Sequence, residues 1–171
     1  MEDDRRSRAG FTLIELMIVL SILGVIAAIA IPQFQRFQLK SKSAEGKVNL
    51  AAIRTAQASY HSEFGRFVAT APNPAVIPGG SKAVFDLANP GFTTIGFVPT
   101  GEVYFSYSAA VSADGIGVTL EAAADLDNDL VPQVWGYVQF DSAGAPVPPL
   151  QGCNVAALSE NQVAPCDTTF G

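Results

Sequence analysis

The chain opens with one long apolar stretch that differs sharply from everything after it. Residues 12–31 contain a single charged side chain, Glu15, and an apolar run of this length spans a bilayer as a helix. Arg5, Arg6 and Arg8 precede the run, so the positive-inside rule places the N-terminus in the cytoplasm. The pattern predicts a transmembrane helix over residues 11–34, with the remainder of the chain across the membrane.

Beyond Pro32 the pattern stays helical but becomes amphipathic. Apolar residues recur at steps of three or four, which places them on one side of a helix. They are Leu50, Ile53, Ala56, Tyr60, Phe64 and Phe67. Gly65 is the expected stop, so the two segments together predict one continuous helix of about 50 residues.

Strand patterns follow in the second half of the chain. Residues 103–113 and 116–123 are apolar and β-branched, and they flank Asp114-Gly115, a dipeptide suited to a tight hairpin turn. Residues 133–140 give a third strand, rich in β-branched and aromatic side chains. An antiparallel sheet of three or four strands within residues 103–140, covered by the helix, makes an α+β head.

The remaining segments predict connections and a tail. Residues 67–101 are rich in Pro and Gly and are expected to form a long connecting loop with short local structure. Residues 145–149 are Pro-rich and end the regular structure. Cys153 and Cys166 follow, and such a close pair in an exported protein is more often a disulfide than a redox site. Two unpaired thiols are the alternative; a disulfide would stabilise the tail by about 3 kcal/mol.

Composition narrows the range of functions. The chain has 171 residues, enough for one domain plus an anchor. Only 15% of them are charged, against about 25% in a typical domain. The net charge is −6, and we expect no basic stripe and no nucleic-acid partner. Motifs of nucleophilic, phosphate-binding and zinc-dependent enzymes are missing, and His61 is the only histidine. We therefore predict no enzymatic activity.

Glu15 decides between three interpretations of the apolar segment. A discarded secretory signal, with an A-x-A-like cleavage site at residues 28–30, and a plain transmembrane anchor both leave this carboxylate uncompensated. Such a charge costs about 2.5–3.5 kcal/mol even on lenient insertion scales. In the third interpretation, Glu15 has a partner of opposite charge.

The sequence Gly10-Phe11-Thr12-Leu13-Ile14-Glu15, followed by LMIVL at 16–20 and AAIAIP at 27–32, resembles the class III signal of type IV pilins and type II secretion pseudopilins. The resemblance covers about the first quarter of the chain. It implies that prepilin peptidase removes residues 1–10 as a leader, and that Phe11 becomes the N-methylated first residue. It also implies that Glu15 neutralises the Phe11 amine of a neighbouring subunit. Pairing within one chain, across a helical turn, is the alternative.

The resemblance carries further expectations. The fold would be the pilin ladle, with residues 35–171 as a periplasmic head and residues 153–166 as a C-terminal disulfide loop. Gly24 and Pro32 bound a weak part of the helix, which becomes extended in related filaments; in an isolated subunit we expect a continuous helix with a kink at Pro32.

The same resemblance implies partners and a location. The chain would wait as a single-pass protein in the inner membrane of a Gram-negative bacterium. It would then join a helical filament of its own copies with the help of a platform protein and cytoplasmic motor ATPases. A minor pilin or a secretion pseudopilin is the alternative within this class, and a membrane-anchored binding protein is the alternative outside it. The sequence does not distinguish motility, adhesion, DNA uptake and secretion.

One acidic cluster is a candidate metal site. Asp125, Asp127 and Asp129 alternate as at the start of an EF-hand loop, and carboxylate oxygens are ligands for Ca²⁺. However, Leu130 and Gly136 stand where that loop needs glycine and a bidentate glutamate. Some pseudopilins and pilin-like proteins hold Ca²⁺ in an acidic loop between strands. The alternative is a solvated turn whose side chains cap backbone groups, without any cofactor.

Overall fold

The computed structural model describes residues 10–166, so the predicted leader before Gly10 lies outside the described residues. Helix α1 spans Leu13–Phe64, which confirms the predicted helix and its length: it has 52 residues. Gly65 ends it with a left-handed φ of +69°, and its N–H donates to the carbonyl of His61 at 2.8 Å. The chain divides into two compact units after Gln38, and each is described by itself.

The first unit holds the apolar part of α1. Its large apolar side chains are exposed throughout, and an 18-residue window of the helix is long and apolar enough to cross a membrane. Pro32 lies inside the helix, which continues past it. The unbroken helix agrees with the form expected for an isolated subunit.

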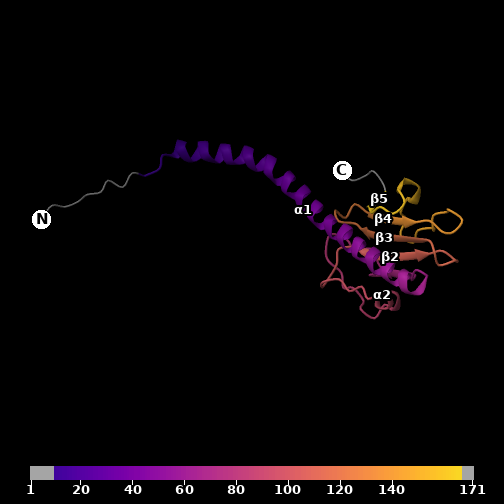
Figure 1. Ribbon diagram of the computed structural model, residues 1–171. Helices are drawn as coiled ribbons and strands as arrows, with labels where there is room; N and C mark the ends of the chain where they lie inside the picture. Colours follow the sequence, from indigo (N-terminus) through magenta and orange to yellow (C-terminus); the bar gives the residue numbers. More distant parts are fainter. Residues whose placement is uncertain (1–9, 167–171) are drawn as a thin grey trace. The chain divides into compact units, whose positions relative to one another are not determined.

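The second unit contains a five-stranded antiparallel sheet in the order β1-β2-β3-β4-β5 (Figure 1). The strands are β1 Thr70–Asn73, β2 Ser106–Val111, β3 Val118–Ala124, β4 Gln133–Gln139 and β5 Ala164–Pro165. Helix α2 spans Pro90–Ile95, and a short 3₁₀ helix, η1, spans Val155–Ala157. The three predicted strands form the centre of the sheet. We expected three or four strands; β1 and β5 add one short strand at each edge.

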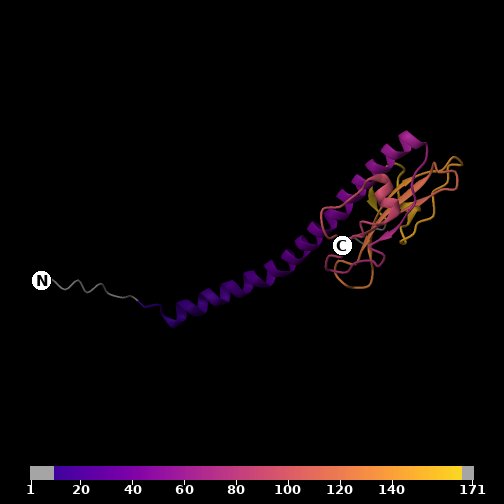
Figure 2. The same ribbon diagram turned by 90° about the horizontal axis from the view of Figure 1, so that it is seen from below.

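One face of the sheet packs against the second half of α1, which lies along it in Figure 2. Leu50 and Ile53 are fully buried there, as the amphipathic pattern predicts. Gly46 lets the helix approach closely, because a Cβ at this position would lie 2.9 Å from the ring of Phe105. Phe64 was expected on this face but is 55% exposed. The chain turns at Gly65, and Phe67 is buried in its place.

The opposite face is covered by the C-terminal segment. Cys153 and Cys166 form a disulfide with their Cα atoms 5.0 Å apart, which confirms the predicted pair and excludes free thiols. The disulfide packs with Leu158 against Val134 and Val138 of β4. Both faces of the sheet are thus buried, and every residue of β3 is buried.

The connection over residues 67–101 is packed rather than loose. Besides β1 and α2, it contributes the buried rings of Phe85, Phe92 and Phe97, whose centroids lie 5.1–6.0 Å apart. At the end of α1, the buried side-chain amide of Gln57 donates to the carbonyl of Val68 at 2.6 Å and accepts from its N–H at 3.0 Å. This paired contact ties the helix to the start of the sheet.

Candidate assembly site and surfaces of the head

Thr12 and Glu15 form a capping box at the start of α1. The hydroxyl oxygen of Thr12 accepts from the Glu15 N–H at 3.3 Å. In return, the Glu15 carboxylate accepts from the Thr12 N–H at 2.8 Å and from the Thr12 hydroxyl at 2.6 Å. This reciprocal pattern satisfies backbone donors that a helix start otherwise leaves unpaired.

The capping box changes what Glu15 needs in the uncleaved chain. The sequence alone suggested a carboxylate without compensation. In the structure, the carboxylate accepts hydrogen bonds from Thr12 of its own chain. Thr12, however, supplies no positive charge, and no ion pair to Glu15 is found among residues 10–166. A cation from elsewhere can still be accommodated, because a carboxylate accepts more than two hydrogen bonds.

Gly10 and Phe11 stand where the predicted cut falls. Both precede α1, have no regular secondary structure and are exposed, Phe11 at 89%. A peptidase needs such extended, accessible backbone. Gly24 lies within α1 and has no neighbour within 4 Å of where a Cβ would be. Close packing within the described chain therefore does not explain why a glycine occurs at position 24.

The acidic turn between β3 and β4 brings its three aspartates together. One carboxylate oxygen each from Asp125, Asp127 and Asp129 lies within 4.8 Å of the others. Their number and spacing suit a calcium ion, which takes oxygen ligands. Both oxygens of Asp125 already accept backbone N–H groups, from Asp129 and Leu130, each at 3.1 Å. An ion is therefore not required to hold the turn.

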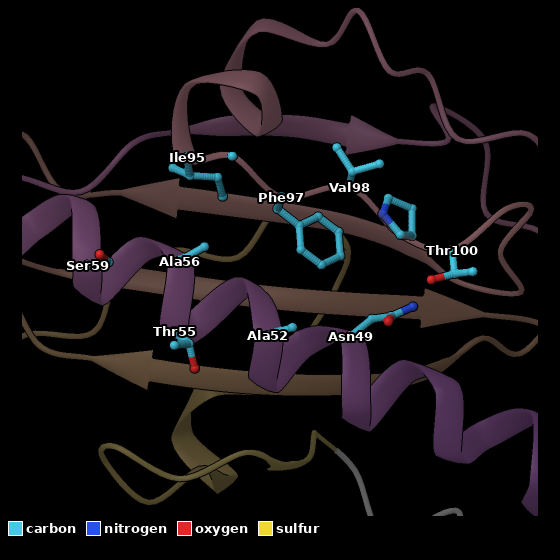
Figure 3. A pocket seen from close by; sticks show the side chains of 11 residues that line it. Asn49, Ala52, Thr55, Ala56, Ser59, Ile95, Phe97, Val98 and Thr100 are labelled. Atoms are coloured by element: carbon cyan, nitrogen blue, oxygen red, sulfur yellow. The ribbon is translucent and has the colours of Figure 1, made fainter.

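A groove in the head lies between residues 49–59 of α1 and residues 95–100, with a volume of about 600 Å³. In Figure 3 the ring of Phe97 projects into it between the helix and the strands, and Asn49 and Thr100 lie at one end. The residues that line it include no acid, base, histidine or cysteine. Its polar lining consists of the Asn49 amide and the hydroxyls of Thr55, Ser59 and Thr100.

Glu121 is a buried acid that sequence reasoning missed. It lies in β3, is 0% exposed and faces the C-terminal segment. Its carboxylate accepts the backbone N–H groups of Leu150 at 2.5 Å, Gln151 at 2.9 Å and Cys153 at 3.0 Å. These bonds attach the segment before the disulfide to the sheet. No sequence pattern marks the role, because the partners are 29 to 32 residues away.

The expectation that the chain has no basic stripe needs correction. Lys40, Lys47 and Arg54 are seven residues apart, so they follow one side of α1; we call them the basic strip. The Lys47 ammonium lies 5.9 Å from the Trp135 ring centre, and the Arg54 guanidinium lies 5.0 Å from that of Tyr137. Within the described part of the chain, no acid pairs with the strip within 4 Å.

The sequence holds a signal for this strip that composition alone conceals. No Lys or Arg follows Lys82, whereas most of the aspartates and glutamates do. The net charge of −6 therefore averages over a basic helix and an acidic remainder. The seven-residue spacing would have placed the cations on one face of the predicted helix.

Comparisons with known proteins give one family match at the N-terminus and several relatives. Residues 5–31 match the family described as the prokaryotic N-terminal methylation motif. The chain is 60% identical over 58 residues to the type IV major pilin protein PilA of Myxococcus xanthus. It is 41% identical over 66 residues to a fimbrial protein of Pseudomonas aeruginosa, and 50% identical over 50 residues to the type IV major alpha-pilin of Moraxella bovis. No solved structure matches.

The similarity is confined to part of each chain. The matched segments cover 34%, 39% and 29% of this chain, in the order given above, and 26%, 43% and 31% of the relatives. The chain thus spans less than half of the length of these relatives. The chain combines an apolar N-terminal helix, which carries the methylation motif, with an α+β head that has a C-terminal disulfide. The motif and the named relatives make this part of the chain similar to type IV pilins.

Proposed function

We propose that the chain is the precursor of a type IV pilus subunit, which is cut after Gly10, N-methylated at Phe11 and polymerised through α1. The observation that carries this proposal is the sequence Gly10-Phe11 before a capped helix whose apolar side chains over residues 13–31 are all exposed. Exposed apolar surface on this scale needs lipid or other helices to cover it. Relatives named as major pilins share the same segment.

Assembly would exchange one apolar environment for another. In the inner membrane, lipid covers the exposed side chains of residues 13–31; in the filament, the same side chains contact the helices of neighbouring copies. Cleavage creates a positive amine at Phe11, and the Glu15 carboxylate of an adjacent copy neutralises it. A buried charge is tolerated when an opposite charge and hydrogen bonds meet it. Prepilin peptidase, a platform protein and motor ATPases are the partners that this pathway requires.

The N-terminal mass of the protein in its filament fraction tests the proposal. We expect a chain that begins at Phe11 and carries one methyl group. A Gly10→Leu variant, which removes the small residue before the cut, should keep its leader and stay in the membrane. A mature protein that still begins at Met1 would contradict the proposal and favour a membrane-anchored binding protein.

The abundance of the chain in sheared filaments separates the alternatives within the class. A major pilin dominates that fraction, as the names of the relatives suggest. A minor pilin or secretion pseudopilin would be present there as a trace component.

A further inference from the structure

The head carries a basic strip and an acidic turn that form no ion pair with each other. The basic strip lies on α1, and its Lys47 and Arg54 are held over aromatic rings rather than against acids. The acidic turn carries the opposite charge, and Asp127 makes no hydrogen bond or ion pair with another described residue. Among residues 39–166 the two patches form ion pairs neither with each other nor with other residues, which makes both candidates for contact with another molecule.

The acidic turn also exposes apolar side chains to solvent, at positions where polar side chains would be expected. Leu130 is 89% exposed and adopts a φ of +69°, a region that branched side chains rarely occupy. Val131 beside it is 57% exposed. We call Asp127, Asp129, Leu130 and Val131 the acidic tip. It consists of an apolar centre with carboxylates at its edge.

The surface beside the basic strip has the matching composition. Val48 is 67% exposed, and Ala44 and Ala51 are exposed on the neighbouring side of the helix. This surface has an apolar centre with Lys47 and Arg54 at its edge. Interfaces between proteins commonly combine an apolar centre with a charged rim, and opposite charges in the rims set the register.

We propose that the acidic tip of one copy docks on the basic strip of a second copy, as a contact between heads in the filament. This inference rests on the proposed function. The two patches are different surfaces of the same chain, so the contact is heterologous and repeats from copy to copy without closing. Such a contact generates an open helical assembly. Charge complementarity favours a second copy as the occupant, because the acidic excess that the strip requires is carried by the chain itself.

Charge reversal tests this contact in cells that assemble the wild-type chain. The reversed strip carries Lys47→Glu and Arg54→Glu, and the reversed tip carries Asp127→Lys, which leaves the hydrogen bonds of the turn intact. The reversed strip places like charges together, and Asp127→Lys cancels the negative charge of the tip, so in each case filaments in the sheared fraction should fall by at least about tenfold. A chain with all three substitutions restores opposite charges and should recover most of the filaments.

Two matched variants control for charge alone. Arg66→Glu and Glu102→Lys make the same changes at exposed sites outside both patches, and they should assemble like the wild type. Protease resistance of the membrane-stored chain shows that each variant is folded. Wild-type assembly of both reversed variants, or a triple variant no better than either, would overturn the contact. If the wild-type chain itself forms no filaments, the proposed function fails, and the contact with it.

Discussion

Gly136 lies in the middle of β4, directly beneath the disulfide. A Cβ at this position would be 2.5 Å from the sulfur of Cys166 and 2.6 Å from that of Cys153, closer than these atoms can approach. We expect Gly136→Ala to lower the free energy of unfolding by about 1–3 kcal/mol, the usual cost of overpacking. Chemical denaturation of the full chain in detergent measures the change.

A double-mutant cycle identifies the cause of this loss. In a chain that also carries Cys153→Ala and Cys166→Ala, both sulfurs are absent, and of the three closest atoms only the end of the flexible Leu158 side chain, at 2.8 Å, still crowds the alanine at 136. Its cost should then shrink by more than half. An unchanged cost would mean that Gly136 is needed for its backbone and not for the space it leaves.

Asp114 makes the stability of the β2–β3 turn depend on pH. Its carboxylate accepts from the hydroxyl of Ser112, from the hydroxyl and N–H of Ser142 at 2.6 and 3.0 Å, and from the Ile116 N–H at 3.0 Å. These bonds, that from Ser112 foremost, hold the pKa of Asp114 well below its ordinary value. A lowered folded-state pKa stabilises the fold above the unfolded-state value, about 3.9, and this stabilisation is lost as the pH falls further.

Thermal unfolding of the wild type and Asp114→Asn at several values of pH tests this prediction. The melting temperature of the wild type should fall more steeply below about pH 4 than that of the variant. Glu102→Gln, at an exposed acid outside this network, should keep the wild-type slope. Parallel curves for all three proteins would show that Asp114 does not contribute to the acid sensitivity.

Individual residues were predictable where their chemistry is local. Spacing and compartment pointed to Cys153 and Cys166, which form the disulfide. The assembly role of Glu15 stays a prediction. Gln57 and Glu121 were not predictable, since their partners are backbone groups brought near only by the fold. A glutamate in a strand pattern normally faces solvent. Its burial follows from the C-terminal segment that covers it.

At the scale of elements, the length of each helix or strand decided whether the sequence could predict it. Helix α1 carries a 3.6-residue pattern over many turns and ends at a glycine, so it was found almost to the residue. The central strands have six or seven residues each. They were predicted, but the predicted first and last residues differ from those in the structure. Strands β1 and β5 have four and two residues, too few for a period, and they exist because neighbouring strands pair with them.

Glu121 joins two elements, the C-terminal segment and β3. Glu121→Gln keeps the size of the side chain but places an amide NH₂ among backbone N–H donors. Because hydrogen bonds to a charged group each contribute about 1.5–3 kcal/mol, we expect a loss of roughly 2–4 kcal/mol in unfolding free energy. Hydrogen exchange should accelerate at Leu150, Gln151 and Cys153 before it does in the sheet. Equal exchange rates in variant and wild type would contradict this role.

The acidic turn is an element whose own hydrogen bonds suffice to hold it. Asp125 and Asp129 cap backbone N–H groups within the turn, and Asn128 accepts from the Gly80 N–H at 3.1 Å. We therefore expect millimolar Ca²⁺ to leave the melting temperature of the chain unchanged, and calorimetry to detect no binding. A calcium-dependent rise that Asp127→Asn abolishes would instead establish a metal site and favour the pseudopilin alternative.

At the scale of the whole molecule, the sequence divides into a part that determines the class and a part that does not. The methylation motif matches residues 5–31, and the pilin relatives match over 50–66 residues of the chain. A head needs only a covered sheet and a soluble surface, which many sequences provide. The α+β class was therefore predictable, but the surfaces of the head required the structure.

Glu15 connects residue chemistry to the whole assembly. In Glu15→Val the carboxylate is gone, so we expect cleavage after Gly10 to proceed but filaments in the sheared fraction to drop at least about tenfold, because each Phe11 amine would be buried without its counter-charge. Thr12→Ala is the matched control: it removes the in-chain hydroxyl partner and keeps the carboxylate. That variant should assemble. Equal defects in both variants would show that Glu15 acts through the capping box of its own helix rather than on a neighbouring chain.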